Sequence, residues 1–329
     1  MGSNPTLSVR TAGQNTAAAE HGLRMIGKTV LVAGASGFVG RHVVARLAAG
    51  GYRVRAAARR SVSDPTLANI EWISADALDP GSLIQAAAGC DAVIHLIGII
   101  RPTPEQGFEQ AHVRATANML HAAEKAGVRR YVQMSALGAA PQAASAYHRT
   151  KWGGEQLVRA GAPAWTIFRP SLIHGPGGEF TALLRAWSLG RAPPFLFMPF
   201  FGGGFFGQRA VTKIQPVYVG DVAEIFVRSL ENDRTTGKTY AVGGPRAMSW
   251  PEMLSIASAI IRGRPRAALG IPFWVGRLLA RLALPGLPFQ IDQVIMAAQD
   301  NTCDVSPLLA DFAPLTLASL ETSMKMYQI

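Results

Sequence analysis

Cysteine is scarce in this chain. Its 329 residues include only Cys90 and Cys303, which lie far apart and form no CxxC pair. A disulfide framework needs more cysteines, and a zinc site needs clustered cysteine or histidine ligands, so neither is expected. The seven histidines form no HExxH motif and no paired metal spacing. We therefore predict no metal site, and a reducing compartment.

Long apolar runs are also missing. No stretch of about 18 uninterrupted apolar residues occurs, so no transmembrane helix is predicted. Residues 1–24 lack the apolar segment of a secretory signal, and we expect a disordered or leader extension before Met25 in a protein that is not secreted. The chain as a whole is 49% hydrophobic, which suffices for a full core in one large domain or in two lobes.

Charged residues make up only 16% of the chain, below the usual ~25%, and the formal net charge is +11. The low fraction of charged residues indicates that another molecule covers part of the protein surface. A basic balance suits nucleic acid, an anionic membrane or an acidic partner. No nucleic-acid-binding motif accompanies it, so we expect no nucleic acid.

Strand and helix signals alternate through the first half of the chain. The expected strands cover residues 29–33, 52–58, 70–74, 92–97, 131–135 and 165–168, the last broken by Pro170. The expected helices cover residues 41–49, 80–88, 108–126 and 146–160. Such alternation predicts an α/β fold with a doubly wound parallel sheet, the Rossmann arrangement, whose ligand crevice lies at the carboxyl ends of the strands.

Proline and glycine become frequent after residue 174, and the regular alternation fades. We expect strands at 215–219 and 239–242, a helix capped by Asp221 that runs through Leu230, and a helix from Ser249 to about Ile261 behind a capping box. This pattern predicts a dinucleotide-binding domain over 25–174, joined by the later strands near 215–242. Residues 175–329 would mainly form a small C-terminal α/β lobe for a substrate or partner.

The segment GASGFVG places Gly34, Gly37 and Gly40 directly after the first expected strand and before a helix. The first glycine permits a tight turn, the second lets the backbone approach a pyrophosphate, and the third lets helix and strand pack closely. The helix N-terminus offers free N–H groups to the phosphates. This context predicts a dinucleotide site. The alternative is a purely structural glycine turn.

The second expected strand ends in Arg59 and Arg60, and no acidic residue lies between Glu20 and Asp64. An NAD site commonly carries Asp or Glu about 20 residues past the first glycine, where it holds the ribose 2′-OH. Guanidinium groups suit a 2′-phosphate instead. We therefore predict NADP(H) in preference to NAD(H). The alternative is a pair of solvated surface arginines.

Ser135 ends the fifth expected strand, and Tyr147 and Lys151 share one face of the helix that follows. A tyrosine phenol can exchange a proton with a substrate, and a nearby ammonium lowers the pKa of that phenol. A serine hydroxyl can hold a carbonyl oxygen as negative charge develops. We predict Ser135, Tyr147 and Lys151 as the catalytic residues of a reductive site, and leave open whether turnover occurs.

Two apolar segments stand out in the second half. Residues 193–207 hold six of the 14 phenylalanines, and residues 271–289 include a basic amphipathic stretch. Between Glu252 and Asp292 there are five arginines and no acid. On a helix, one broad face would carry Trp274, Val275, Leu278, Leu279 and Leu282, and the other Arg277 and Arg281. This pattern is typical of a helix on an anionic membrane or in a partner's groove. The alternative is that both segments fill the core of the lobe.

These motifs together resemble the short-chain dehydrogenase/reductase superfamily, in its extended and atypical branch of NAD-dependent epimerase-like sequences. The resembling segments are GASGFVG, Asp76, HLIG at 95–98, Ser135, Tyr147 with Lys151, RPSLIHGPG at 169–177 and QPVYVGDVA at 215–223. The chain is also similar to the family of Rossmann-fold accessory subunits of respiratory complex I and their bacterial relatives. That similarity rests on KIQPVYVGDVA at 213–223, Asp300-Asn301 and the phenylalanine-rich segment, and spans roughly residues 26–320.

The resemblance implies a set of coenzyme contacts. They are Gly34, Ser36, Gly37, Phe38, Val39, Gly40, Arg59, Arg60, Asp76, Ala77, Leu96, Ile97, Gly98, Tyr147, Lys151, Pro170, Ser171 and Ile173. Asp76 would accept a hydrogen bond from the adenine amino group, or else serve as a turn residue. His112 stands where extended members often carry an asparagine of the proton relay. The alternative for His112, and for His95, is an ordinary partly buried histidine.

The resemblance also implies a function. The chain would be an NADP(H)-binding accessory or assembly subunit of respiratory complex I, with a structural or regulatory coenzyme. It would lie in the bacterial cytoplasm or mitochondrial matrix, with complex I subunits as partners, and contact an anionic inner membrane through 193–207 and 271–289. The alternative is a soluble NADP-dependent oxidoreductase or epimerase that uses Ser135, Tyr147 and Lys151 on a nucleotide sugar or other carbonyl compound.

Overall fold

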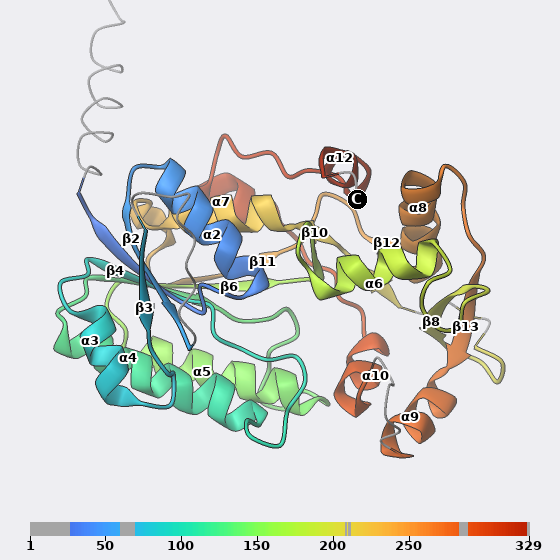
Figure 1. Ribbon diagram of the computed structural model, residues 1–329, viewed down its shortest axis with the longest axis horizontal. Coiled ribbons are helices and arrows are strands. Elements are labelled where there is room, and N and C mark those ends of the chain that lie inside the picture. The colour runs from blue at the N-terminus through green and yellow to red at the C-terminus, as the bar shows by residue number, and fades with distance from the viewer. Residues whose placement is uncertain (1–26, 60–69, 208, 210–211, 283–288, 328–329) are drawn as a thin grey trace, which may run out of the picture.

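The computed structural model describes residues 27–59, 70–207, 209, 212–282 and 289–327. Within them, a seven-stranded parallel sheet lies between two layers of helices (Figure 1). The strand order is β11-β6-β5-β4-β1-β2-β3. The strands are β1 (Thr29–Ala33), β2 (Arg53–Ala58), β3 (Ile70–Ser74), β4 (Ala92–His95), β5 (Arg130–Met134), β6 (Trp165–Pro170) and β11 (Lys238–Val242). The predicted doubly wound Rossmann sheet is confirmed.

The interior strand β1 reads TVLVA and is almost wholly buried, as expected for a parallel sheet covered on both faces. Its register pairs Val32 with Ala56 of β2 on one side and with Ile94 of β4 on the other. Alternate residues of β1 therefore point into two different cores, Val32 into one and Leu31 into the other.

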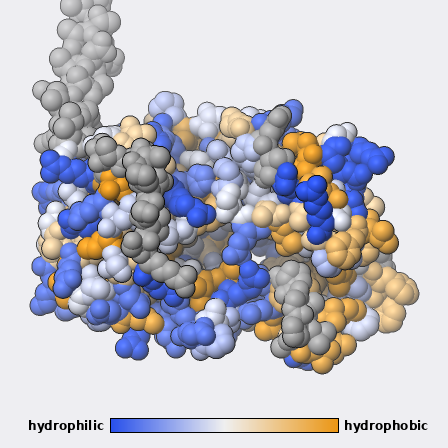
Figure 2. All heavy atoms as spheres, in the orientation of Figure 1, coloured by the Kyte–Doolittle hydropathy of each residue, from blue (hydrophilic) through white to orange (hydrophobic). Residues whose placement is uncertain are grey.

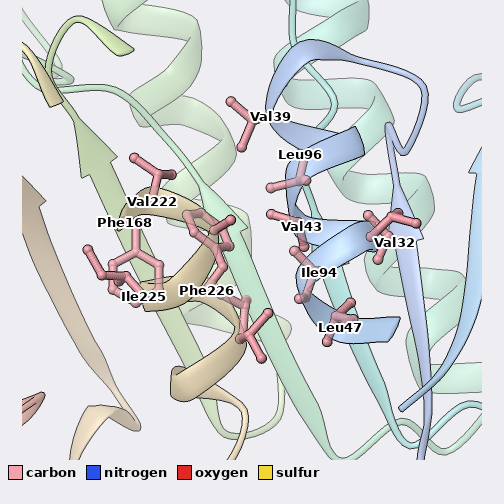
Figure 3. Close-up of a cluster of buried hydrophobic side chains, with 14 of the residues drawn as sticks. Val32, Val39, Val43, Leu47, Ile94, Leu96, Phe168, Val222, Ile225 and Phe226 are labelled. Carbon is pink, nitrogen blue, oxygen red and sulfur yellow. The ribbon is translucent and has the colours of Figure 1, made fainter. Parts of the chain in front are cut away.

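One core lies beneath α2 (Phe38–Ala49) and α7 (Val219–Ser229). Figure 3 shows Val43 and Leu47 of α2 and Phe226 of α7 converging on the sheet. The opposite face is covered by α3 (Pro80–Ala87), α4 (Ala115–Lys125) and α5 (Ala146–Gly161). A π turn, η1 (Gln110–Arg114), precedes α4 within the helix expected over 108–126. Helices therefore cover both faces of the sheet.

The remaining elements form a smaller lobe beside those strand ends (Figure 1). A third core joins three of its helices through residues such as Leu184, Met253 and Met324. Its helices are α6 (Glu179–Ser188), α8 (Trp250–Arg262), α9 (Phe273–Leu282), α10 (Ile291–Ala297) and α12 (Leu320–Met326). Its paired short strands are β7 (Ile173–His174) with β10 (Val217–Tyr218), β9 (Lys213–Ile214) with β12 (Met248–Ser249), and β8 (Met198–Gly202) with β13 (Ala268–Pro272). A 3-10 turn η2 (Asp233–Thr235) and α11 (Ser306–Asp311) pack near the sheet edge.

Three local expectations were wrong. Of the strand expected at 215–219, only β10 at 217–218 forms. Gln215 and Pro216 separate it from β9 at 213–214, because proline has no N–H for a ladder. Tyr218, not Asp221, precedes α7, and the Asp221 carboxylate accepts a hydrogen bond from Ala318 N at 2.8 Å. Pro170 does not break β6 at residue 168. It is the last residue of the strand and pairs with Val242.

Candidate functional site

The turn after β1 has the backbone geometry that its glycines predict. Gly34 has φ +87°, and a Cβ there would lie 3.2 Å from the backbone of Leu96 and Ile97. A Cβ on Gly40 would overlap the carbonyl oxygen of Gly34. Only glycine therefore permits both the left-handed turn and the close packing of α2 against that turn.

The start of α2 is open to a ligand. Gly37 is its N-cap, no side chain of the described residues caps the helix, and its first turn carries no acid. Ser36 and Gly37 are exposed, while Val39 and Gly40 are buried against the sheet. Unpaired N–H groups at a helix start attract anions, so this turn fits a pyrophosphate. The residues present here are therefore compatible with a dinucleotide.

A loop of the second lobe covers one side of α2. His42 Nε2 lies 3.0 Å from the carbonyl oxygen of Pro176, and the Phe38 ring packs so closely on Gly178 that a Cβ there would lie 2.9 Å from it. The HGPG segment therefore closes over the glycine-turn helix. Sequence reasoning missed this contact because it joins residues more than 130 positions apart.

The ends of β2 and β3 carry the residues expected near the adenosine. Arg59 directly follows β2 and is exposed, whereas Arg60 lies outside the described residues. Asp76 is exposed, and its Oδ1 accepts a hydrogen bond from Leu78 N at 2.9 Å. Asp76 therefore does serve as a turn residue, while Ala77 beside it is buried and its carbonyl binds Asn118.

Gly98 and Lys151 come together at the end of β4. The chain passes from His95 through buried Leu96 and half-buried Ile97 to exposed Gly98. A Cβ on Gly98 would lie 2.5 Å from Lys151 Nζ. The lysine ammonium therefore lies directly against the backbone that follows β4, at the edge where a Rossmann ligand binds.

Ser135 and Lys151 are buried polar side chains that have few hydrogen-bond partners among the described residues. Lys151 Nζ donates to Met134 O at 3.4 Å, and burial lowers the pKa of Lys151 to about 8. Ser135 Oγ has no hydrogen-bond partner among the described residues. Buried polar groups are normally paired, so the two groups at the end of β5 point to a polar ligand.

Three aromatic rings pack around the side chain of Tyr147. Its ring centroid is 5.3 Å from that of His112, 5.3 Å from that of His148 and 5.9 Å from that of Phe108. Burial raises the pKa of Tyr147 to about 12, so the phenol is protonated near neutral pH. A group that lowers this pKa, such as a nearby cation, would be needed before it could act as a base.

His112 is a member of this site, and it is buried. Its Nδ1 lies 2.8 Å from Thr150 Oγ1, and its Nε2 lies 3.1 Å from Ile99 O. It therefore bridges the segment after β4 to α5, and it sits in the π turn η1, a distortion frequent at functional sites. Burial and the charge of Lys151 lower its pKa to about 2, so it is neutral. His95, by contrast, lies within the core beneath, with Nε2 3.3 Å from Thr116 Oγ1.

Residues after β6 are engaged within the protein. Ser171 N donates to Val242 O at 2.8 Å, and Ser171 Oγ donates to Asn301 O at 3.0 Å. Its hydroxyl is thus already bound. Pro170 ends β6, and Ile173 begins β7 in the second lobe.

Asp292 is a site neighbour that sequence reasoning missed. Its Oδ1 accepts a hydrogen bond from Ala146 N at 2.6 Å and lies 3.4 Å from Tyr147 N. The carboxylate thus reaches from α10 to the helix of Tyr147. No local motif marks this residue, because the contact joins positions about 145 residues apart.

Both apolar segments expose side chains. The alternative that they simply fill the core is wrong for the large side chains at the end of the molecule formed by β8, β13 and α9 (Figure 2). These exposed residues, which we call the apolar surface, are Phe195, Leu196, Phe205, Phe206, Leu269, Trp274, Leu278 and Leu282. Among the helices that the structure describes, none combines the length and apolar character needed to cross a bilayer.

The sequence matches known proteins over most of its length. Residues 30–243 match the NAD dependent epimerase/dehydratase family. Subunit 9 of the mitochondrial NADH dehydrogenase (ubiquinone) 1 alpha subcomplex from Arabidopsis thaliana is 33% identical over 301 residues, which cover 87% of this chain and 72% of that protein. The mouse protein of the same name is 33% identical, over 67% of this chain and 57% of that protein.

A ceramide reductase from Caulobacter vibrioides is 34% identical over 51% of this chain and 52% of that protein. Solved structures share the fold. MoeE5 in complex with UDP-glucuronic acid and NAD superposes with a TM-score of 0.71 at 22% identity, over 91% of this chain and 97% of that one. An epimerase from Methanothermobacter thermautotrophicus gives 0.71 at 18% identity, over 94% and 93%.

The name of the matched family indicates a nicotinamide dinucleotide as the coenzyme class. The uncapped helix start after the glycine turn is compatible with such a coenzyme. The chain therefore belongs to the NAD dependent epimerase/dehydratase family, with the Rossmann-like fold of short-chain dehydrogenases and homology to subunit 9 of the complex I alpha subcomplex.

Proposed function

We propose that this chain is an NADP(H)-binding accessory or assembly subunit of respiratory complex I, in which the coenzyme has a structural or regulatory role. The observation that carries the proposal is the homology to plant and mouse complex I subunits, over 87% and 67% of the chain. The open start of α2 and the exposed Arg59 support the coenzyme. The partners would be complex I subunits, in the bacterial cytoplasm or mitochondrial matrix beside the inner membrane.

The coenzyme would lie across the carboxyl ends of the strands. The pyrophosphate would meet the amides of Gly37 and Phe38, and the 2′-phosphate would meet Arg59. The nicotinamide ribose would approach Lys151 and Ser135, whose polar atoms have few partners of their own. Mass spectrometry of the ligand retained by the natively purified protein tests this, with NADP(H) expected. Retention of NAD(H), or no affinity for either coenzyme in calorimetry, contradicts it.

Association with complex I is tested by affinity purification from the host membrane. We expect the tagged chain to recover complex I subunits, and its deletion to reduce assembled complex I on native gels. Normal assembly in the deletion strain, together with no recovered subunits, contradicts the proposal.

The apolar surface would contact the anionic membrane beside the complex. Trp274, Leu278 and Leu282 repeat at helical spacing along α9, and the exposed Arg277 and Arg281 alternate with them. Such a helix combines apolar insertion with attraction to anionic headgroups. In vesicle flotation, we expect binding to anionic but not to zwitterionic vesicles, and loss of binding in a Trp274→Ser, Leu278→Ser variant. The matched control is Ile100→Ser, since Ile100 is exposed outside this surface.

A second candidate function is an NADP-dependent oxidoreductase or epimerase acting on a nucleotide sugar or other carbonyl compound. It is favoured by the retained Ser135, Tyr147 and Lys151, and by the similarity to a ceramide reductase. Steady-state NADPH oxidation over a panel of carbonyl compounds tests it, and Tyr147→Phe should abolish any rate found. If Tyr147→Phe leaves the cellular function unchanged, the catalytic role fails.

A further inference from the structure

Helix α5 begins with two separate caps. The first is local, because Ser145 Oγ accepts a hydrogen bond from His148 N at 3.2 Å. The second comes from the other lobe, because Asp292 Oδ1 accepts from Ala146 N at 2.6 Å. Tyr147 N lies 3.4 Å from the same oxygen. The first N–H groups of a helix have no partner within the helix, and a negative charge there is favourable.

Asp292 is not needed to start its own helix. Gln290 and Gln293 cap α10 reciprocally through their side chains and backbones. The carboxylate of Asp292 is therefore directed outward, to a helix that begins about 145 residues earlier in the chain.

Helix α10 is in turn packed tightly on α9. A Cβ added to Gly276 of α9 would lie 3.3 Å from Val294 Cγ1 of α10 and 2.5 Å from the Phe201 ring of β8. Val294 is fully buried. The position of Asp292 thus depends on how α9 and α10 sit in the second lobe.

We propose that Asp292 is a positioning residue that holds the first turn of α5, and with it Tyr147, in the dinucleotide site. The inference rests on the proposed function, since it takes that site to bind NADP(H). Tyr147 is the second residue of α5 and lies within the turn that Asp292 caps. Lys151 is one turn further along, so fraying of the start would displace the phenol first and the ammonium less.

The test compares Asp292→Ala with Asp292→Asn. Alanine removes the acceptor, whereas the asparagine amide oxygen can still accept from both N–H groups. The control is Asp304→Ala, because Asp304 also accepts a backbone N–H, that of Ser306 at 2.9 Å, but at the start of α11. Hydrogen exchange of residues 146–149 and calorimetric titration with NADPH are the two measurements.

For Asp292→Ala we expect exchange about fivefold faster and confined to the start of α5, the effect typical of losing one cap, together with a raised Kd for NADPH. Asp292→Asn should restore both to within about twofold of the unchanged protein. Asp304→Ala should change neither.

Unchanged exchange and affinity in Asp292→Ala overturn the inference. So does a uniform rise in exchange over the whole chain, which marks global destabilisation, and so does failure of Asp292→Asn to restore the start of α5. If the unaltered protein binds no NADPH, the proposed function fails. The exchange measurement then still decides whether Asp292 holds α5.

Discussion

At the scale of single residues, the site depends on which charges and hydrogen-bonding groups are left free. Arg59 is exposed at the end of β2, and Lys151 is buried beside Gly98, where its ammonium makes a long contact to the carbonyl of Met134. An exposed cation is available to a phosphate, whereas a buried one carries a desolvation cost until a ligand reaches it.

Arg59→Asp should weaken NADPH binding and spare or improve NADH binding, because the new carboxylate repels a 2′-phosphate and can hold a 2′-OH. Calorimetric titration with both coenzymes measures this. Arg53→Asp is the matched control, since Arg53 is exposed at the opposite end of the same strand and the change in net charge is identical. Equal loss of affinity for both coenzymes contradicts the assignment.

The pH dependence of the free energy of unfolding should reflect the lowered pKa of Lys151. Burial lowers its pKa from 10.5 to about 8, so between these values the unfolded chain binds more protons than the folded one. Stability therefore rises with pH across this window. From pH 7.5 to 9.5 the free energy of unfolding should gain about 2 kcal/mol relative to Lys151→Met, as measured by urea denaturation. A constant difference between the two proteins across this range would show that the ammonium is not desolvated.

At the scale of elements, the site is made by helices that approach strands and one another unusually closely. Helix α2 packs at Gly40 against the turn that follows β1, where no Cβ fits, and η1 widens its helix around His112. These features set where the first turn of α2 and the start of α5 lie relative to the sheet. The elements that bear the site are thus positioned by backbone contacts as much as by the apolar core.

Gly40→Ala should destabilise the fold by about 1–3 kcal/mol, the range for overpacking, because its Cβ would overlap the backbone of Gly34 and Ala35. Chemical denaturation measures the change. Gly161→Ala is the control. Gly161 ends α5, and no atom in the described part of the chain lies within 4 Å of the added Cβ, so the substitution should be neutral or slightly stabilising. Similar effects of the two substitutions would mean that α2 can shift away from β1 at little cost.

At the scale of the whole molecule, the second lobe presents the apolar surface on one side and reaches the dinucleotide site on the other. Trp274 and Leu278 of α9 belong to that surface, while Asp292 of α10 reaches α5. The HGPG loop closes over α2 from the same lobe. A partner that binds the apolar surface and a ligand that binds the dinucleotide site would therefore both touch elements that contact one another through the second lobe.

If the apolar surface docks on a membrane and Asp292 positions α5, the two binding events should be coupled. Coupling is reciprocal, so anionic vesicles should tighten NADPH binding by about fivefold, the low end for linked sites. Titration with NADPH in the presence of anionic or zwitterionic vesicles measures this, and Asp292→Ala should abolish the difference. An unchanged Kd, with the protein shown to be vesicle-bound, would exclude the coupling.

Local sequence patterns were enough to predict the Rossmann sheet and several of its boundaries. Strands β1 and β3 begin and end where expected, and α5 differs from its expected range by one residue. Strands buried on both faces are continuous apolar runs, and glycines and caps mark where they stop, so each signal lies within a few neighbouring residues. The second half was less predictable, because its short strands pair across long separations and carry weak patterns.

By itself, the sequence determined the glycine turn, the order of strands and helices, and the placement of Ser135 after a strand and of Tyr147 and Lys151 on the helix that follows. Their coenzyme and catalytic roles remain predictions. Only the tertiary structure decided that Lys151 lies against Gly98, that His112 contacts Tyr147, and that Asp292 caps α5. The physical reason is the separation of the residues along the chain. A turn or a local cap is specified by adjacent residues, whereas these contacts depend on how distant elements pack.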